Sequence, residues 1–387
     1  MPVQAIDVQC IREDLLNALQ AAEAVVPGNN IKKILSNLCL TVGDDHMVVS
    51  ATDQQIGLRA LVRRLQVHRP GTVLVPARQL VGILKESGSR DVRIHVGESG
   101  DGQLLHIDLQ DGQYHLPVFP SEEFPVISGF PEESTPIPVA AADLERMIRC
   151  TLFAVDKDRS SAVLSGVYCA IAEEEFLLTA TDGKVLVEAR RRDPVYGSLP
   201  DTSLIIPALT VNHLSRLLGS HQQGDVALAV AKNLIFVRAV LRGSEEGAPI
   251  QVEINSRLIE GVYPSYRNAI PTQSEDAVGF RSAELATGLR RTVLMTSSAN
   301  RGIVMTIGRD GAMLSNLSHS TGTAEIPVPC RYDGAEQRIG MNASNLQEIL
   351  RVYRREELSL ELNGRGRGMI IRDDDETYLI MPITLPN

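Results

Sequence analysis

Apolar residues recur at helical spacing in six short segments of the chain. In the first segment, Leu15, Leu19 and Ala22 follow one another at intervals of four and three residues. A stripe of this kind predicts an amphipathic helix with one buried face. By the same spacing we predict six helices, at residues 12–24, 77–86, 141–153, 208–218, 282–293 and 343–355.

Between the predicted helices, shorter runs alternate apolar and polar residues around a repeated landmark. Leu35 precedes Thr52 by 17 residues, the same spacing that separates Leu164 from Thr181, and each Thr is followed by an Asp (Asp53 and Asp182). Alternation over such a distance is typical of half-buried strand pairs. A weaker third copy runs from residue 301 to 318 and lacks the Asp. The chain therefore contains a threefold internal repeat.

Pro-rich connectors at residues 124–138 and 263–271 separate the copies. We predict three similar domains, at 1–128, 129–265 and 266–387, each with two helices and several short strands. Helices on one face of antiparallel sheets make an α+β fold. Three similar domains can form an arc, and arcs joined head to tail can close into a ring. A monomeric three-domain scaffold is the alternative.

The composition is that of a folded protein, with 43% hydrophobic and 22% charged residues. With 4% aromatic residues and no Trp, a platform for stacking single-stranded bases is not expected. We expect no membrane partner, because the apolar runs are too short to span a bilayer. The N-terminal residues do not resemble a signal peptide, and five scattered cysteines indicate reduced thiols. We therefore expect a cytoplasmic protein.

The net charge of −10 argues against a nucleic-acid partner unless positive charge is concentrated locally. The six predicted helices together carry +3, which leaves −13 on the rest of the chain. The basic residues that contribute to this positive charge include Arg78, Lys85, Arg146, Arg149, Arg216, Arg290, Arg291, Arg351, Arg354 and Arg355. If the helices face one cavity, its lining attracts phosphates without reading bases. Solvated polar helix faces are the alternative.

The sequence lacks the common signatures of catalysis and cofactor binding. It has no glycine-rich nucleotide motif and no nucleophile elbow, and its eight histidines show no metal-binding spacing. Asp53 and Asp182 occupy equivalent repeat positions, so we interpret them as turn residues rather than as a catalytic dyad. Residues 364–368 (GRGRG) predict a hairpin turn, with an RNA-binding Gly/Arg tract as the alternative. We predict a protein that is not an enzyme and needs no metal or cofactor.

Several segments, taken in order, resemble the bacterial DNA polymerase III beta subunits, which are sliding clamps. They are ATDG at 180–183, EGVYPSYR at 260–267 and YLIMPI at 378–383, supported by 75–78 and 119–125. The resemblance implies a homodimeric ring of clamp domains around duplex DNA, with helices lining the hole and antiparallel sheets outside. Such a ring is a processivity factor in DNA replication. Its implied protein partners are the replicative polymerase, an ATP-driven clamp loader, repair polymerases and mismatch-repair proteins, all of which bind through short linear peptides.

The resemblance also implies a hydrophobic peptide cleft between the second and third domains. The matching positions are Leu164, Thr181, Gly183, Lys184, Val185, Leu186, Pro264, Ala269, Asn342, Asn345, Leu379, Ile380, Met381, Pro382 and Ile383. An apolar groove with a few backbone donors suits extended peptide anchors. Without the resemblance, residues 379–383 read as an ordinary last strand.

Contacts to DNA and to a second subunit follow from the same resemblance. The DNA candidates are Arg78, Asn29, Lys32, Lys33, Arg149, Lys157, Arg159 and Arg216. Arg78 matches the family directly, whereas Asn29 stands where an Arg is expected. The implied dimer contacts are Tyr114, Leu116, Leu294 and Met295.

Three departures from the family pattern alter the expected peptide preference. Lys184 and Val185 replace the usual His and Arg, Asn345 replaces an aromatic residue, and the chain continues through Pro386 and Asn387. Two alternatives stay open at this stage. One is an accessory clamp for repair or inhibitor resistance, and the other is a protein-binding scaffold that does not meet DNA.

Overall fold

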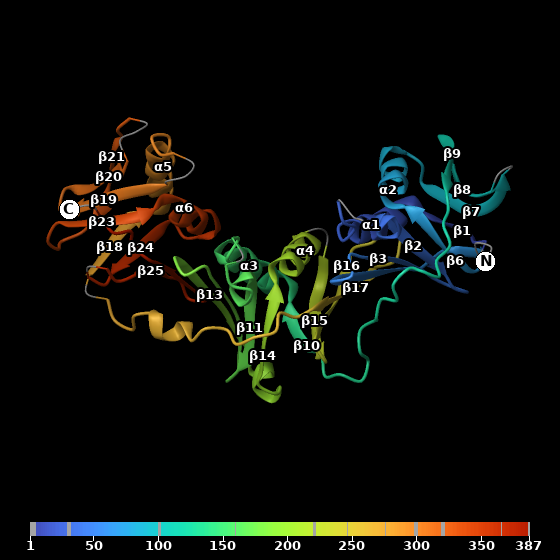
Figure 1. The fold of residues 1–387 in the computed structure, drawn as a ribbon, viewed down its shortest axis with the longest axis horizontal. Coiled ribbons are helices and arrows are strands. Elements are labelled where there is room, and N and C mark those ends of the chain that lie inside the picture. The colour runs from blue at the N-terminus through green and yellow to red at the C-terminus, as the bar shows by residue number, and fades with distance from the viewer. Residues whose placement is uncertain are drawn as a thin grey trace. The chain divides into compact units, whose positions relative to one another are not determined.

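The structure is a computed structural model that describes residues 5–28, 32–99, 102–158, 160–219, 222–245, 247–274, 276–297, 301–318, 322–364 and 366–385. Within these residues the chain forms six α-helices and four antiparallel sheets (Figure 1). They belong to two compact units. Unit one holds residues 1–145 and 209–258, and unit two holds residues 146–208 and 259–387. The division cuts through the second repeat.

The six predicted helices are all present. They are α1 (Arg12–Glu23), α2 (Ala77–Glu86), α3 (Ala141–Thr151), α4 (Ala208–Gly219), α5 (Ser282–Val293) and α6 (Ala343–Val352). The predicted stripe of α1 is its buried face, since Leu15, Leu19 and Ala22 are fully buried. This confirms that the apolar spacing reports the helix and the side that packs on the sheet.

Two helices, α3 and α6, end two or more residues earlier than predicted. At the end of α3, the Thr151 hydroxyl donates a 2.8 Å hydrogen bond to the Met147 carbonyl, and a 3-10 turn (Leu152–Ala154) follows. Such side-chain bonds to the backbone compete with continued helix. At the end of α6, Tyr353 is extended, and Arg355 pairs with Asp373 and Asp374 in a later turn. Arg354 and Arg355 therefore lie outside the helix that was expected to carry them.

Unit one contains two sheets. The larger has the strand order β10 (Ile137–Ala140), β15 (Gln222–Ala231), β16 (Leu234–Leu241), β17 (Ile250–Arg257), β4 (Ile56–Val62), β3 (Met47–Thr52), β2 (Asn37–Val42), β6 (Gly71–Pro76). The smaller has the order β5 (Gln66–Arg69), β1 (Asp7–Ile11), β7 (Asp91–Ser99), β8 (Gly102–Leu109), β9 (Gly112–Pro117). Helix α1 packs against α2 and β4.

Unit two repeats the plan. Its larger sheet has the order β14 (Thr202–Pro207), β11 (Gly166–Ala172), β12 (Glu175–Thr181), β13 (Val185–Arg192), β26 (Glu376–Ile380), β25 (Met369–Arg372), β24 (Glu357–Leu362), β18 (Asp276–Arg281), β22 (Cys330–Arg331). Its smaller sheet has the order β21 (Glu325–Val328), β20 (Gly311–Asn316), β19 (Gly302–Gly308), β23 (Gln337–Asn342). The glycine-rich segment 364–368 joins the antiparallel strands β24 and β25, so the predicted hairpin is confirmed.

Neighbouring repeats share a sheet in each unit. In unit one β17 pairs with β4, with Val252 opposite Ala60. In unit two β13 pairs with β26, with Val187 opposite Tyr378. Both junctions join the strand after the Thr-Asp turn of one repeat to the last strand of the next. The two seams are therefore equivalent by the internal repeat.

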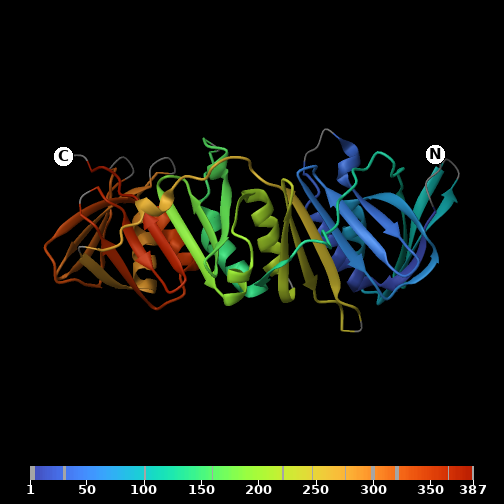
Figure 2. The ribbon, with the colours of Figure 1, turned by 90° about the horizontal axis from the view of Figure 1, so that it is seen from below.

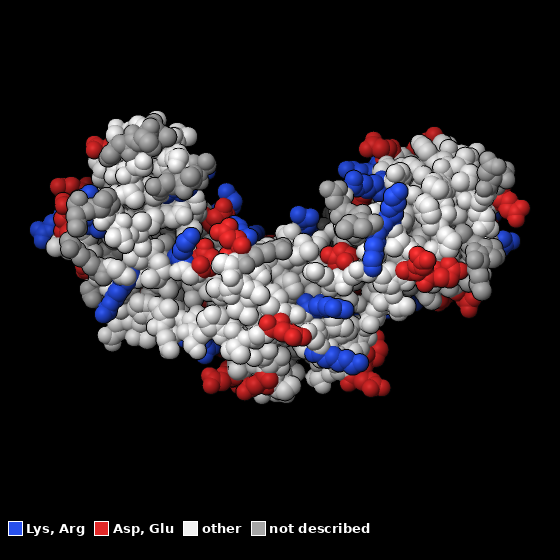
Figure 3. All heavy atoms as spheres, viewed as in Figure 1, with Lys and Arg blue, Asp and Glu red and all other residues white. Residues whose placement is uncertain are grey.

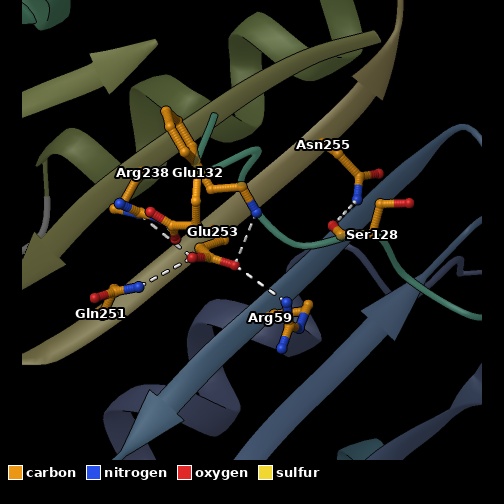
Figure 4. Close-up of polar contacts among 8 residues, drawn as sticks. Arg59, Ser128, Glu132, Arg238, Gln251, Glu253 and Asn255 are labelled. Carbon is orange, nitrogen blue, oxygen red and sulfur yellow. Dashed lines mark hydrogen bonds and ion pairs between the residues drawn. The ribbon is translucent and has the colours of Figure 1, made fainter. Parts of the chain in front are cut away.

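The first connector crosses the strands of unit one (Figure 2). Glu253 on β17 holds it, because its carboxylate accepts bonds from the Phe130 amide at 3.2 Å and from Gln251 at 2.9 Å. The same carboxylate lies 3.3 Å from an Arg59 nitrogen and 3.4 Å from Arg238 Nε (Figure 4). The Arg238 guanidinium also stacks over the Phe130 ring. These contacts fix the connector to both repeats of unit one.

The state of the cysteines and the length of the helices relate to two expectations from the sequence, namely reduced thiols and no membrane-spanning segment. All five cysteines are free thiols, and four of them are buried. In the part of the chain that the structure describes, the helices are too short or too polar to cross a membrane.

Candidate partner-binding and DNA-binding sites

The residues predicted for the peptide cleft all belong to unit two. A tight turn between β12 and β13 carries the first of them. The Asp182 carboxylate accepts hydrogen bonds of 2.8 Å from the amides of Lys184 and Val185. The Thr181 hydroxyl donates to the Val185 carbonyl at 2.7 Å, and Gly183 has φ +81°. These bonds present exposed Gly183 and Lys184 at the tip of the turn.

A hydrophobic cluster lies next to this turn. Its buried members are Leu177, Leu186, Ile205, Tyr263, Tyr266, Ile370 and Leu379, with Val163, Leu164, Tyr168, Ala170, Ile259 and Ile270 packed around them. Tyr168 stacks on Tyr263 with ring centroids 5.0 Å apart, and both rings meet Tyr266 edge-on. Aromatic contacts of this kind add to the free energy of burial and hold the rings in fixed orientations.

The polar tips of two of these tyrosines differ in their surroundings. The Tyr266 hydroxyl donates to Glu188 at 2.8 Å and accepts from the Thr179 hydroxyl at 3.1 Å. Burial raises the pKa of Tyr266 to about 12, so its hydroxyl stays protonated. The Tyr263 hydroxyl is buried near the Thr181 backbone without a well-formed hydrogen bond among the described residues, and burial raises its pKa as well.

The last described residues of the chain form backbone hydrogen bonds with the turn between β12 and β13 and with β23. The Met381 amide donates to the Lys184 carbonyl, and the Ile383 amide donates to the Gly340 carbonyl, each at 2.8 Å. Near this strand, Asn342 caps α6 by accepting from the Ser344 amide at 2.9 Å. Residues up to 380 are thus an ordinary last strand, and 381–383 extend from it to contact two further segments.

Burial divides the predicted cleft residues into three classes. Val185, Leu186, Leu379 and Ile380 are at most 4% exposed, so they form the support of the site rather than its surface. The exposed members are Gly183, Lys184, Pro264, Ala269 and Met381. The partly buried members are Leu164, Asn342, Asn345, Pro382 and Ile383, while Thr181 is buried. Val185, which stands where the family usually has Arg, is buried. Its substitution therefore changes the support of the site and not its exposed surface.

Sequence reasoning missed several members of the cluster. Tyr263 and Tyr266 stand inside the segment EGVYPSYR and were available as a signal. Leu177 and Ile370 look like any strand residue in the sequence. They reach the cluster only because β12, β13, β26 and β25 are neighbours in one sheet.

The candidate DNA contacts are exposed basic residues of both units. Arg78, Lys32, Lys33 and Arg216 belong to unit one, and Arg149 and Lys157 belong to unit two. Asn29 and Arg159 lie outside the described residues. Lys and Arg side chains are interspersed with Asp and Glu on the face drawn in Figure 3.

Local ion pairs change the expected balance of charge on the helices. Arg146 on α3 is mostly buried and pairs with Glu376 and, at 3.6 Å, with Asp375. Arg351 on α6 pairs with Glu348 at 2.9 Å. Together with Arg355, these residues carry charge that nearby carboxylates neutralise. The predicted positive lining is thus weaker than a count of basic residues indicates.

The predicted dimer contacts are mostly exposed. Tyr114 on the edge strand β9 is 43% exposed, and Leu294 and Met295 after α5 are 76% and 36% exposed. Leu116 is buried inside unit one and therefore offers little side-chain surface. A strand at the edge of a sheet, and apolar residues exposed after a helix, are each features that proteins usually cover.

Comparison with known proteins decides the family. Models of the DNA polymerase III beta subunit match in three consecutive parts: the N-terminal domain at residues 6–128, the central domain at 138–265 and the C-terminal domain at 267–384. The chain belongs to the DNA polymerase III beta subunit family. The predicted α+β fold of three clamp domains is confirmed.

Individual relatives agree over nearly the whole length. The beta sliding clamps of Pseudomonas putida and Escherichia coli K12 are each 26% identical over 97% of this chain and 98% of their own. The crystal structure of the DNA polymerase III subunit beta from Pseudomonas aeruginosa has a TM-score of 0.85 and 25% identity, covering 98% of this chain and 100% of that chain. The beta subunit from Thermotoga maritima has a TM-score of 0.86.

Family membership establishes the activity in outline. The chain is a DNA sliding clamp, the non-catalytic processivity subunit of DNA polymerase III. DNA and a polymerase are therefore its partners.

Proposed function

We propose that this clamp works as a homodimeric ring that recruits its partners through short linear peptides bound at the site in unit two. Its partners would be the replicative polymerase, an ATP-driven loader, repair polymerases and mismatch-repair proteins. The observation that carries the proposal is the set of exposed residues Gly183, Lys184, Pro264 and Met381 beside the buried aromatic cluster. A clamp structure from Pseudomonas aeruginosa bound to griselimycin supports a ligand site in the family.

The chemistry of this site favours an extended peptide with small apolar anchors. The aromatic cluster supplies rigid apolar support, while Pro264 and Met381 supply apolar surface at its edge. Exposed Lys184 favours an acidic residue in the peptide next to the anchors. Extended peptides bind in this way through a few anchors and backbone hydrogen bonds.

We also propose that DNA phosphates contact Arg78, Lys32, Lys33, Arg149, Lys157 and Arg216. Asn29 and Arg159 are further candidates. Arg78 stands near the start of α2 with an exposed side chain, which suits contact with a backbone phosphate. Arg78→Ala should weaken binding equally on unrelated duplexes and reduce the slope of log K against log salt by about one. A loss confined to one DNA sequence would indicate base readout and contradict this assignment.

The peptide site is tested by removing one exposed methionine. Met381→Ala deletes apolar surface at the site and should weaken a polymerase-derived peptide by about tenfold, which corresponds to about 1.4 kcal/mol. Met313→Ala is the matched control, because Met313 lies on β20 of the same unit and is 38% exposed, compared with 39% for Met381. Fluorescence anisotropy with a labelled peptide measures both affinities. Equal affinity of the two variants would place the peptide site elsewhere.

A further inference from the structure

Three histidines, which we call the histidine ladder, lie side by side on the smaller sheet of unit one. His95 on β7 is paired with His106 on β8, and His106 is paired with His115 on β9. These strands are neighbours in the sheet (Figure 1). Ile94 and Ile107 are fully buried on the opposite face, so the ladder lies on the outer face. His106 is partly exposed there and His115 is exposed.

The internal repeat shows that the fold does not require histidines at these positions. The residue pairs that directly precede the first helix of each repeat give the common register: Ile11–Asp91, Ala140–Asp225 and Arg281–Glu357. From these pairs, the equivalents of the ladder are Ala229, Phe236 and Asn255 in the second repeat and Glu361, Ile370 and Leu379 in the third.

Connector residues pack on the equivalent positions of the other two repeats. Phe130 contacts Ala229 and Phe236 in unit one. In unit two, Tyr263 and Tyr266 belong to the same hydrophobic cluster as the third repeat's apolar positions. Support for a connector therefore explains the residues at these two places, but it does not explain three histidines in the first repeat.

The rings of His106 and His115 are arranged like two ligands of one ion. Their centroids are 4.5 Å apart and their planes meet at 72°. Two imidazoles that bind one zinc ion tetrahedrally, each through a nitrogen about 2 Å from the metal, have centroids about 5 Å apart. His95 lies nearly parallel to His106, so the in-plane lone pairs of that pair do not meet. Within the described residues no group of three or more His, Cys, Asp or Glu side chains is placed to hold a metal ion, which leaves a site with two protein ligands.

The state of the two rings also suits metal binding. Among the described residues, none forms a hydrogen bond or an ion pair with a ring nitrogen of His106 or His115. Burial and then the neighbouring histidines lower the pKa of His106, while Asp108 acts in the opposite direction. The ring is therefore neutral at pH 7, which is the form that binds metals. The nearby cation Arg93 is neutralised by a two-point ion pair with Asp7.

We propose that His106 and His115 bind one divalent metal ion that prefers nitrogen ligands, such as Zn²⁺, with water completing its coordination. His95 would position His106 by stacking on it, and the Asp108 carboxylate, 3.4 Å from His95 Nδ1, would orient His95. A bound ion would join β8 to the edge strand β9. The proposal is independent of the peptide site and of the DNA contacts.

Isothermal titration calorimetry of the full-length protein with zinc chloride, after treatment with a chelator, tests the binding. We expect saturable binding of one Zn²⁺ per chain at pH 7.5. Excess Mg²⁺ should not compete, because Mg²⁺ prefers oxygen ligands. No saturable Zn²⁺ binding, or full competition by Mg²⁺, would overturn the proposal.

Variants locate the ion. His106→Gln and His115→Gln should each weaken Zn²⁺ binding by at least about tenfold, because each removes one of two ligands. His68→Gln is the matched control and should leave the affinity unchanged, since His68 is an exposed histidine on β5 of the same sheet. Circular dichroism checks that each variant is folded. If His106→Gln and His115→Gln bind Zn²⁺ as the unchanged protein does, the ion is bound elsewhere and the proposal fails.

A second measurement needs no variant. Diethyl pyrocarbonate modifies accessible histidines, and mass spectrometry of the digested protein reports the modification of each one. Zn²⁺ should protect His106 and His115 but not His68. Equal protection of all three histidines, or of none, would contradict the assignment.

Discussion

At the residue scale, two turns show how the repeat is encoded. The Asp53 carboxylate accepts from the amides of Gln55 and Ile56, just as Asp182 accepts from Lys184 and Val185. The turn role predicted for both aspartates is therefore confirmed. The residue after each Asp adopts a left-handed conformation, with φ +79° at Gln54 and φ +81° at Gly183. The sequence pattern predicted the turn because side-chain oxygens fix it locally.

Alanine substitutions at Gly183 and Gly82 should change the free energy of unfolding in opposite directions, because only Gly183 has a left-handed conformation. Gly183→Ala should lower the free energy of unfolding by about 1 kcal/mol, because alanine is strained at φ +81° although space is available. Gly82→Ala should raise it by about 0.5 to 1 kcal/mol, because Gly82 lies inside α2 with open space around it. Urea unfolding midpoints measure both changes. Destabilisation by Gly82→Ala equal to that of Gly183→Ala would contradict the conformational argument.

Three histidines form a ladder across the smaller sheet of unit one. His106 on β8 stacks against His95 on β7 at 4.8 Å and meets His115 on β9 at 4.5 Å. Burial lowers the pKa of His106, and the two neighbouring histidines lower it further, while Asp108 acts in the opposite direction. Folding therefore disfavours the protonated ring.

The sign of the resulting pH dependence follows from linkage. Above the unfolded pKa of about 6.5 the ring is neutral in both states, and pH has no effect through this group. As pH falls below 6.5, the unfolded chain takes up the proton first and stability is lost, until the folded pKa is passed. His106→Gln should lose less stability than the unchanged protein between pH 7.5 and pH 5.5, as measured by urea midpoints. An equal loss in both proteins would show that other groups govern this range.

At the element scale, apolar spacing located every helix but not every helix end. The ends of α3 and α6 depend on the Thr151 hydroxyl and on the pairing of Arg355 with distant aspartates. Neither interaction is visible as a period in the sequence. The peptide site was also only partly predicted. The segment motifs identified its exposed residues but not all of its buried ones. Leu177 and Ile370 join it only through strand order.

The connector anchor in Figure 4 gives a test of how one element is held. Glu253→Gln keeps the size of the side chain but leaves Arg59 and Arg238 without their shared carboxylate. We expect a loss of about 1 to 2 kcal/mol in unfolding free energy and faster proteolysis within residues 118–136, since both arginines are partly exposed. Glu132→Gln is the control. Its side chain is 77% exposed, so the loss should stay within about 0.5 kcal/mol.

If Glu253→Gln is cleaved in the connector no faster than Glu132→Gln, the carboxylate does not anchor the connector. In that case the packing of Phe130 against Ala229 and Phe236 would hold it instead.

At the scale of the whole molecule, the threefold period predicted the number of clamp domains but not the two compact units. The strand pairs β17–β4 and β13–β26 join successive repeats, so the second repeat contributes strands to both units. Pairing between repeats is a long-range property. The alternation of residues within one repeat does not specify it.

Assembly is tested at the apolar residues after α5. Replacing both Leu294 and Met295 by Ala removes exposed apolar surface that the proposed dimer would bury, at very roughly 1.5 to 3 kcal/mol for each side chain. Sedimentation should show monomers at concentrations where the unchanged protein is dimeric. Leu209→Ala, at a 46% exposed leucine on α4, is the control and should remain dimeric. A double variant that stays wholly dimeric would contradict the interface.

We expect this sliding clamp to be held on DNA by topology. The most direct measurement is retention of the protein on nicked circular DNA after loading by its clamp loader with ATP, followed by gel filtration at a salt concentration that removes weak contacts. We expect the protein to elute with the circular DNA and to be released when a restriction enzyme linearises that DNA. Equal retention on circular and linear DNA, or no loader-dependent retention on the circle, would show that topology does not hold this protein on DNA.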